Sequence, residues 1–232
     1  MWLCNSSIGR KVVMSVTGLA LVLFLTFHAC MNVVAIFSEE GYNMICEFLG
    51  ANWYAVAATA VLAALIIIHF VFAIILTIQN RKARGNNRYD VTDKPQKVEW
   101  ASQNMFVLGI IVCLGLLLHL YNFWFNMMFA ELAGTSTPNG IDPADGYQMI
   151  VYTFHGAGVQ SYIYAALYVV WICALWFHLT HGIWSGMQTL GANNKVWFCR
   201  VKTISYWYAT IVMLMFLVVV LYFAFGGTAL LD

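Results

Sequence analysis

The sequence predicts an all-α integral membrane protein that folds as a bundle of five transmembrane helices. Of its 232 residues, 62% are hydrophobic and only 9% are charged, and the mean hydropathy is +0.77. A soluble domain of this size needs more polar surface than this composition provides. The number of helices follows from the apolar runs, and their direction follows from the basic residues.

Five apolar runs are long enough to cross a hydrocarbon core about 30 Å thick. The predicted helices cover, approximately, residues 12–37, 53–79, 102–130, 163–188 and 204–226. The first run follows Arg10 and Lys11 and is longer than the apolar core of a signal peptide, so we expect a transmembrane helix there. We find no internal repeat and no second domain, so residues 1–232 are expected to form a single domain.

All eleven Lys and Arg residues lie on one side of the predicted bundle. Two precede the first helix, six follow the second and three follow the fourth. The opposite loops and the C-terminus carry acids and no basic residue: Glu39, Glu40, Glu47, Glu131, Asp142, Asp145 and Asp232. Because basic loops remain in the cytoplasm, we expect the N-terminus inside and the C-terminus outside.

The six cysteines show no CxxC or CxxCH spacing: Cys4, Cys30, Cys46, Cys113, Cys173 and Cys199. Most lie within apolar runs, where cysteine behaves as a small hydrophobic residue. Neither a disulfide framework nor a covalently attached haem is therefore expected.

Five of the six histidines lie within the predicted spans: His28, His69, His119, His178 and His181. A lone histidine in such a helix more often packs or forms a hydrogen bond than binds a metal. At 1.5 Å per residue, however, His28 and His119 both lie about 25 Å from the cytoplasmic end of their helices. His69 and His178 lie about 24 and 22 Å from the outer surface. Four helices thus contribute one histidine each, which form an outer and an inner pair.

Two neutral imidazoles that face each other from different helices can hold a haem iron between them. We therefore predict two haem b groups, the outer one bound by His28 and His119 and the inner one by His69 and His178. A zinc or di-iron site would gather the histidines at one level and add carboxylates. A proton-coupled transporter would need an ionisable group near the midplane and broken helices.

Three glycines precede the predicted outer ligands at short distances in the sequence. Gly18 and Gly109 lie ten residues before His28 and His119, and Gly115 lies one turn before His119. Such glycines would let the backbone approach a haem closely.

Two stretches resemble a known family. "HLTHGIWSGMQTLG" (178–191) and "RKVVMSVTGLALVLFLTFH" (10–28) are similar to the dihaem cytochrome b subunit of succinate dehydrogenase and fumarate reductase, of the single-anchor type with five helices. Aligning Gly182 with the family's glycine makes His178 the ligand and puts His181 where the family often has Asn. The order of ligands on the first four helices matches over the whole chain.

The resemblance implies a location in the bacterial cytoplasmic (inner) membrane. It also implies two partners on the cytoplasmic face, a flavoprotein subunit that interconverts succinate and fumarate and an iron–sulfur subunit. The chain has no Gly-rich dinucleotide motif and no cysteine cluster, so it holds neither flavin nor iron–sulfur centre. It would conduct electrons to or from a quinone such as menaquinone. We expect no nucleic-acid partner, and a dimer of heterotrimers is left open.

Quinol oxidation releases protons, so a proton acceptor is needed near the outer haem. We predict Glu47, in the loop between the first two helices, where family members place such a carboxylate; partial burial would raise its pKa. The alternative is that Glu39, Glu40 and Glu47 form a solvated loop. His155, just outside the fourth helix, is either solvated or close to the quinone ring.

The chain departs from the family at Trp176, where some fumarate reductases carry a glutamate used in proton passage across the membrane. A proton pathway by that route is therefore in doubt. Two other functions remain open from the sequence: a haem-free polytopic transport or binding protein, and a b-type cytochrome subunit of another quinone-linked dehydrogenase.

The asymmetry of basic residues predicts the topology. In a variant without native cysteines, a cysteine placed at Asp90 should react with an impermeant label only from the cytoplasmic side, and one at Asp142 only from outside. The opposite labelling pattern would exchange the inner and outer haems.

Overall fold

The computed structural model describes residues 6–84, 99–192 and 194–231, and the regular structure within these ranges is helical throughout. Five helical segments among them are long and apolar enough to cross a membrane, as the sequence predicts. They are α2 (Ser7–Phe37), α4 (Trp53–Arg84), α5 (Trp100–His119) with its continuation, α8 (Val159–Thr189) and α9 (Trp197–Ala224). Cys4, Arg88, Asp90, Lys94, Lys97 and Asp232 lie outside the described residues.

The spans are longer than predicted, mainly at the end of the bundle where their basic residues lie. α2 begins at Ser7 because the Ser6 side chain accepts a hydrogen bond from Gly9 N at 2.9 Å and so caps the helix. α4 continues through Arg81 and Lys82. Long basic side chains can bury their stems while their charged groups stay in water, so the apolar pattern alone places this helix end too early.

The third span changes its hydrogen-bonding pattern directly after His119. α5 is followed without a break by a π-helix, η1 (Leu120–Phe129), and by a last turn, α6 (Ala130–Ala133). The span ends at Gly134, whose φ of 62° lies in the left-handed region that glycine adopts easily. π-Helical turns often occur at functional sites, and this one begins beside a predicted ligand.

Two segments that the sequence predicts as loops contain short helices. Ser38 caps the first of them by accepting from Gly41 N at 3.0 Å, and the acids Glu39 and Glu40 favour its first turn. Asp145 caps the second by accepting from Gln148 N at 3.0 Å. These helices are α3 (Glu39–Phe48), α7 (Gly146–Val151) and the π-helical turn η2 (Tyr152–Gly156).

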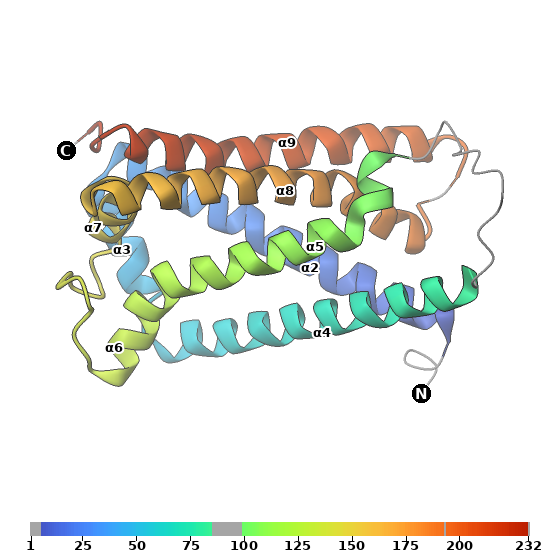
Figure 1. Cartoon of the computed structure of the whole chain (residues 1–232), viewed down its shortest axis with the longest axis horizontal. Coiled ribbons are helices and arrows are strands. Elements are labelled where there is room, and N and C mark those ends of the chain that lie inside the picture. The colour runs from blue at the N-terminus through green and yellow to red at the C-terminus, as the bar shows by residue number, and fades with distance from the viewer. Residues whose placement is uncertain (1–5, 85–98, 193, 232) are drawn as a thin grey trace.

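The helices run between two ends of different charge (Figure 1). One end contains the start of α2, the end of α4 and the α8–α9 connection. We call it the basic end, because it carries the described Lys and Arg residues: Arg10, Lys11, Arg81, Lys82, Arg84, Lys195, Arg200 and Lys202. At the other end lie α3, α6 and α7. It is called the acidic end because it carries Glu39, Glu40, Glu47, Glu131, Asp142 and Asp145.

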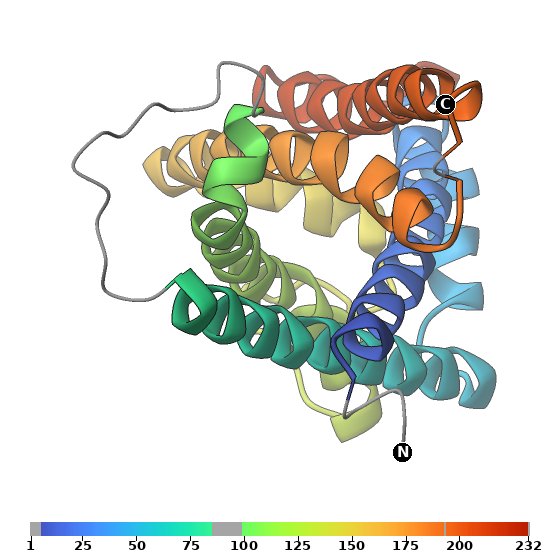
Figure 2. The ribbon, with the colours of Figure 1, turned by 90° about the vertical axis from the view of Figure 1, so that its right-hand side faces the viewer.

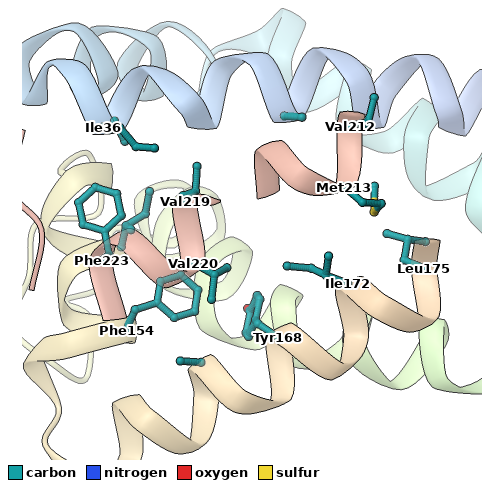
Figure 3. Packing of buried hydrophobic residues seen from close by; sticks show 14 of the residues in the cluster. Ile36, Phe154, Tyr168, Ile172, Leu175, Val212, Met213, Val219, Val220 and Phe223 are labelled. Atoms are coloured by element: carbon teal, nitrogen blue, oxygen red, sulfur yellow. The ribbon is translucent and has the colours of Figure 1, made fainter. Parts of the chain in front are cut away.

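The apolar core lies mainly between α2, α8 and α9, which Figure 2 shows in blue, orange and red. Figure 3 shows part of it, with Val220 of α9 near Tyr168 of α8 and Met213 of α9 near Leu175 of α8. α4 is different, because it packs mainly against α2 and none of its most apolar stretch is buried within the chain. The core therefore fixes α2, α8 and α9, and α4 lies against one side of that group.

Candidate functional site

Four histidines from four helices lie together as two pairs. The ring centroids of His28 on α2 and His119 on α5 are 5.7 Å apart, with an angle of 79° between the planes. Those of His69 on α4 and His178 on α8 are 6.5 Å apart, at 67°. The structure thus brings together the same residues that the depth argument pairs. Their role as axial ligands stays a prediction.

The separation within each pair suits one metal atom between two imidazoles. An imidazole nitrogen lies about 2 Å from a metal it binds, so two rings on opposite sides of one metal have centres roughly 6 Å apart. In addition, His178 Nδ1 is buried and has no hydrogen-bond partner in the part of the chain that the structure describes. Buried ring nitrogens normally have a partner. The donor set and its spacing therefore fit two bis-imidazole haems.

Aromatic side chains surround the His28–His119 pair. Phe24 stacks on His28, with ring centroids 5.4 Å apart and an angle of 13°, and Phe216 lies 5.7 Å from the same ring. The His119 ring has three aromatic neighbours, Phe123, Tyr168 and Trp171, at 5.3, 6.3 and 5.7 Å. Such an apolar environment suits a flat, largely apolar macrocycle.

The three glycines do not all have the expected role. A Cβ atom at Gly115 would lie 2.1 Å from Trp171, so this glycine makes room for the indole beside His119. Gly18 faces His69 of the inner pair, because ten residues of helix separate it in depth from His28. Nothing lies within 4 Å of a Cβ built at Gly109. Gly18 thus lies against the inner pair, and the approach of these glycines to a haem stays a prediction.

A polar contact that the sequence did not reveal connects His28 with the acidic end. Asn32 Nδ2 donates to the His28 carbonyl oxygen at 2.8 Å and lies 3.3 Å from the ring nitrogen Nδ1. Its amide oxygen accepts from the Tyr42 hydroxyl of α3 at 3.3 Å. Burial raises the pKa of Tyr42 well above its usual value, so the hydroxyl keeps the proton that it donates.

His181 lies outside both pairs and takes part in an ion cluster at the basic end. Its Nδ1 atom is 3.5 Å from Glu99 Oε2, and Glu99 also forms an ion pair with Lys202. Burial raises the pKa of Glu99, but the hydrogen bonds and charges of Lys202 and His181 outweigh it, so this pKa lies below its usual value. The cluster joins α5, α8 and α9. The interpretation of His181 as a hydrogen-bonded residue near the helix end agrees with these contacts.

The position where some family members carry glutamate is filled by an indole that bonds to α9. Trp176 Nε1 donates to Thr210 Oγ1 at 2.9 Å. Trp176 also lines a cavity of about 460 Å³ beside the Glu99–Lys202 ion pair, together with Trp100. The paired histidines do not line this cavity, so it is separate from the predicted haem sites.

The predicted quinone-site residues lie at the acidic end, and one expectation about them is wrong. Glu47 belongs to helix α3 rather than to a loop, and it is exposed rather than partly buried. Glu131 Oε2 accepts from Ala51 N at 3.1 Å, beside the turn that follows α3. His155 lies exposed in η2, with Nδ1 3.4 Å from Ala224 O.

Comparison of the chain with protein-family models, with curated proteins and with solved structures gave no match. The assignment of a function therefore depends on the residues and their geometry.

The pairing predicts which histidine of α8 is the ligand. His178→Ala should remove one low-spin haem signal, because it deletes one of the two imidazoles at its level, while His181→Ala should leave both signals. The measurement is the haem content and absorption spectrum of the purified protein, with His155→Ala as a matched control. Two retained haems in His178→Ala, with loss of one in His181→Ala, would exchange the two roles.

Proposed function

We propose that the chain is the dihaem cytochrome b membrane-anchor subunit of a quinone-linked succinate dehydrogenase or fumarate reductase. The observation that carries the proposal is that four helices of an apolar bundle contribute one histidine each to two pairs. Bound haem iron would supply one-electron transfer at each pair. The chain's own residues hold and orient the groups at two depths.

The distance between the two levels supports electron conduction across the membrane. Thr17 on α2 contacts His69 and so marks the level of the inner pair on that helix. It precedes His28, at the outer level, by eleven residues, which is about 16 Å of helix. This is about half of a hydrocarbon core ~30 Å thick. Two haems at these levels would therefore divide the distance across the membrane into shorter steps for the electron.

The charge of the two ends supports an orientation. With the basic end in the cytoplasm, the His69–His178 pair lies closer to the flavoprotein and iron–sulfur subunits proposed to bind there. The His28–His119 pair is then left for the quinone at the acidic end. Two haems would be unnecessary if the quinone reacted next to the iron–sulfur subunit. The protein would be a multi-pass component of the bacterial inner membrane.

A reduced-minus-oxidised absorption spectrum tests the proposal directly. We expect the purified complex to contain two low-spin haems b, both reduced when succinate or a quinol is added. A protein without haem would instead support a polytopic transporter or binding protein. Two haems that a quinol reduces, but succinate does not, would support a cytochrome subunit of another quinone-linked dehydrogenase.

The location of Glu47 at the acidic end leads to a test of its role. A base must lie within hydrogen-bond reach of the quinol hydroxyl, directly or through one water. Glu47→Gln keeps the shape of the side chain and removes the base, so quinol-linked turnover should fall by about 10²-fold. Both haem spectra and succinate–fumarate activity with artificial dyes should be unchanged.

Glu131→Gln serves as the matched control, because Glu131 lies at the same end and its carboxylate already accepts a bond from Ala51 N. Normal quinol turnover in Glu47→Gln together with a large loss in Glu131→Gln would transfer the role to Glu131.

A further inference from the structure

Thr17 is a buried hydroxyl of α2 that contacts a histidine of the neighbouring helix. Only 5% of the residue is exposed, and its Oγ1 atom lies 3.2 Å from His69 Nδ1. The contact joins two helices at the level of the His69–His178 pair. The hydroxyl therefore acts on one of the four paired imidazoles.

The direction of this hydrogen bond follows from the other neighbours of the hydroxyl. Thr17 Oγ1 lies 2.8 Å from Val13 O and 3.2 Å from Met14 O. Carbonyl oxygens only accept hydrogen bonds, so the single hydroxyl proton points to the backbone. Oγ1 then accepts from His69 Nδ1–H, and the Met14 backbone carbonyl is a second hydrogen-bond partner of the same ring. A neutral imidazole carries one proton, so His69 Nε2 has a free lone pair with which to bind a metal.

The next residue along α2 limits the position of the same ring. A Cβ atom at Gly18 would lie 3.0 Å from His69 Cε1, closer than ordinary contacts. The absence of a side chain at Gly18 therefore leaves room for the imidazole, and the hydroxyl of Thr17 holds its Nδ1 atom. Thr17 and Gly18 together fix where the ring lies.

The other imidazoles with known polar surroundings lack an equivalent bond. The side-chain nitrogen of Asn32 is the polar atom beside the His28 ring, and it donates rather than accepts. His178 Nδ1 has no hydrogen-bond partner in the described part of the chain. An effect that depends on an acceptor at Nδ1 should therefore be specific to the inner pair.

We infer that Thr17 is a positioning residue that fixes the tautomer of His69 and lowers the reduction potential of the inner haem. An acceptor bonded to the imidazole nitrogen that does not bind the metal increases the basicity of the ligand. A more basic ligand stabilises ferric iron relative to ferrous iron. The inference rests on the proposed function, because it assumes that His69 binds a haem.

Redox titration of both haems in the complete complex tests the inference. Thr17→Val keeps the shape and removes the hydroxyl acceptor, while the Met14 backbone bond to His69 remains. The ratio of reduced to oxidised inner haem at a fixed potential should therefore rise by up to about tenfold, or ~59 mV for a one-electron couple. The outer haem should not change, and Thr17→Ser should behave as wild type. Thr77→Val is the matched control. Thr77 on α4 donates its hydroxyl proton to the carbonyl oxygen four residues earlier, Ala73 O at 2.7 Å, as Thr17 does to Val13 O.

The outcomes separate the inference from the proposed function. No haem in the wild-type complex would overturn the proposed function itself. With two haems present, an unchanged inner potential in Thr17→Val, or an equal shift of both haems, would overturn the role of Thr17 alone. If Thr17→Val loses the inner haem, Thr17→Ser must keep it; loss in both variants would show that the hydroxyl is not the determinant.

Discussion

Every polar ring that enters this bundle must find a partner away from water. Neither the hydrocarbon core nor the packed helices supply water to a ring nitrogen, and an unpaired buried polar group costs about 1–3 kcal/mol. His69 meets this requirement among the described residues, because its Nδ1 atom lies 3.2 Å from Thr17 Oγ1. His178 does not, because its Nδ1 atom has no partner there. Because the four paired rings come from four helices, the requirement also determines how those helices face one another.

Polar contacts between segments lie at both ends of the bundle. The paired histidines lie between these ends. At the basic end, Glu99 joins His181 of α8 to Lys202 of α9. At the acidic end, Asn43 of α3 donates to Asp145, the cap of α7, at 3.0 Å. Between these ends the spans are mostly apolar. Hydrogen bonds and ion pairs fix the helix ends. Aromatic and aliphatic packing determines the distances between the helices in the middle of the bundle.

The depth of each residue could be predicted from the sequence, but the direction of its side chain could not. A rise of 1.5 Å per residue is enough to pair His28 with His119, and the five spans follow from apolar length alone. Which side of a helix faces a neighbour depends on packing, so the contact of Thr17 with His69 and the fit of Gly115 against Trp171 were missed. The helix α3 could have been found, because Ser38 precedes two acids.

The position of α4 connects the histidine pairs to the stability of the fold. Its most apolar stretch is not buried within the chain, so packing on α2 is its main contact. It reaches α5 through Arg81, which lies 5.2 Å from the ring centroid of Phe106, and it reaches α8 through the contact of His69 with His178. A ligand that joins these two rings would bind the folded arrangement and not the separated helices. Its binding free energy would then add to the stability of the bundle, and it would act mainly on the placement of α4.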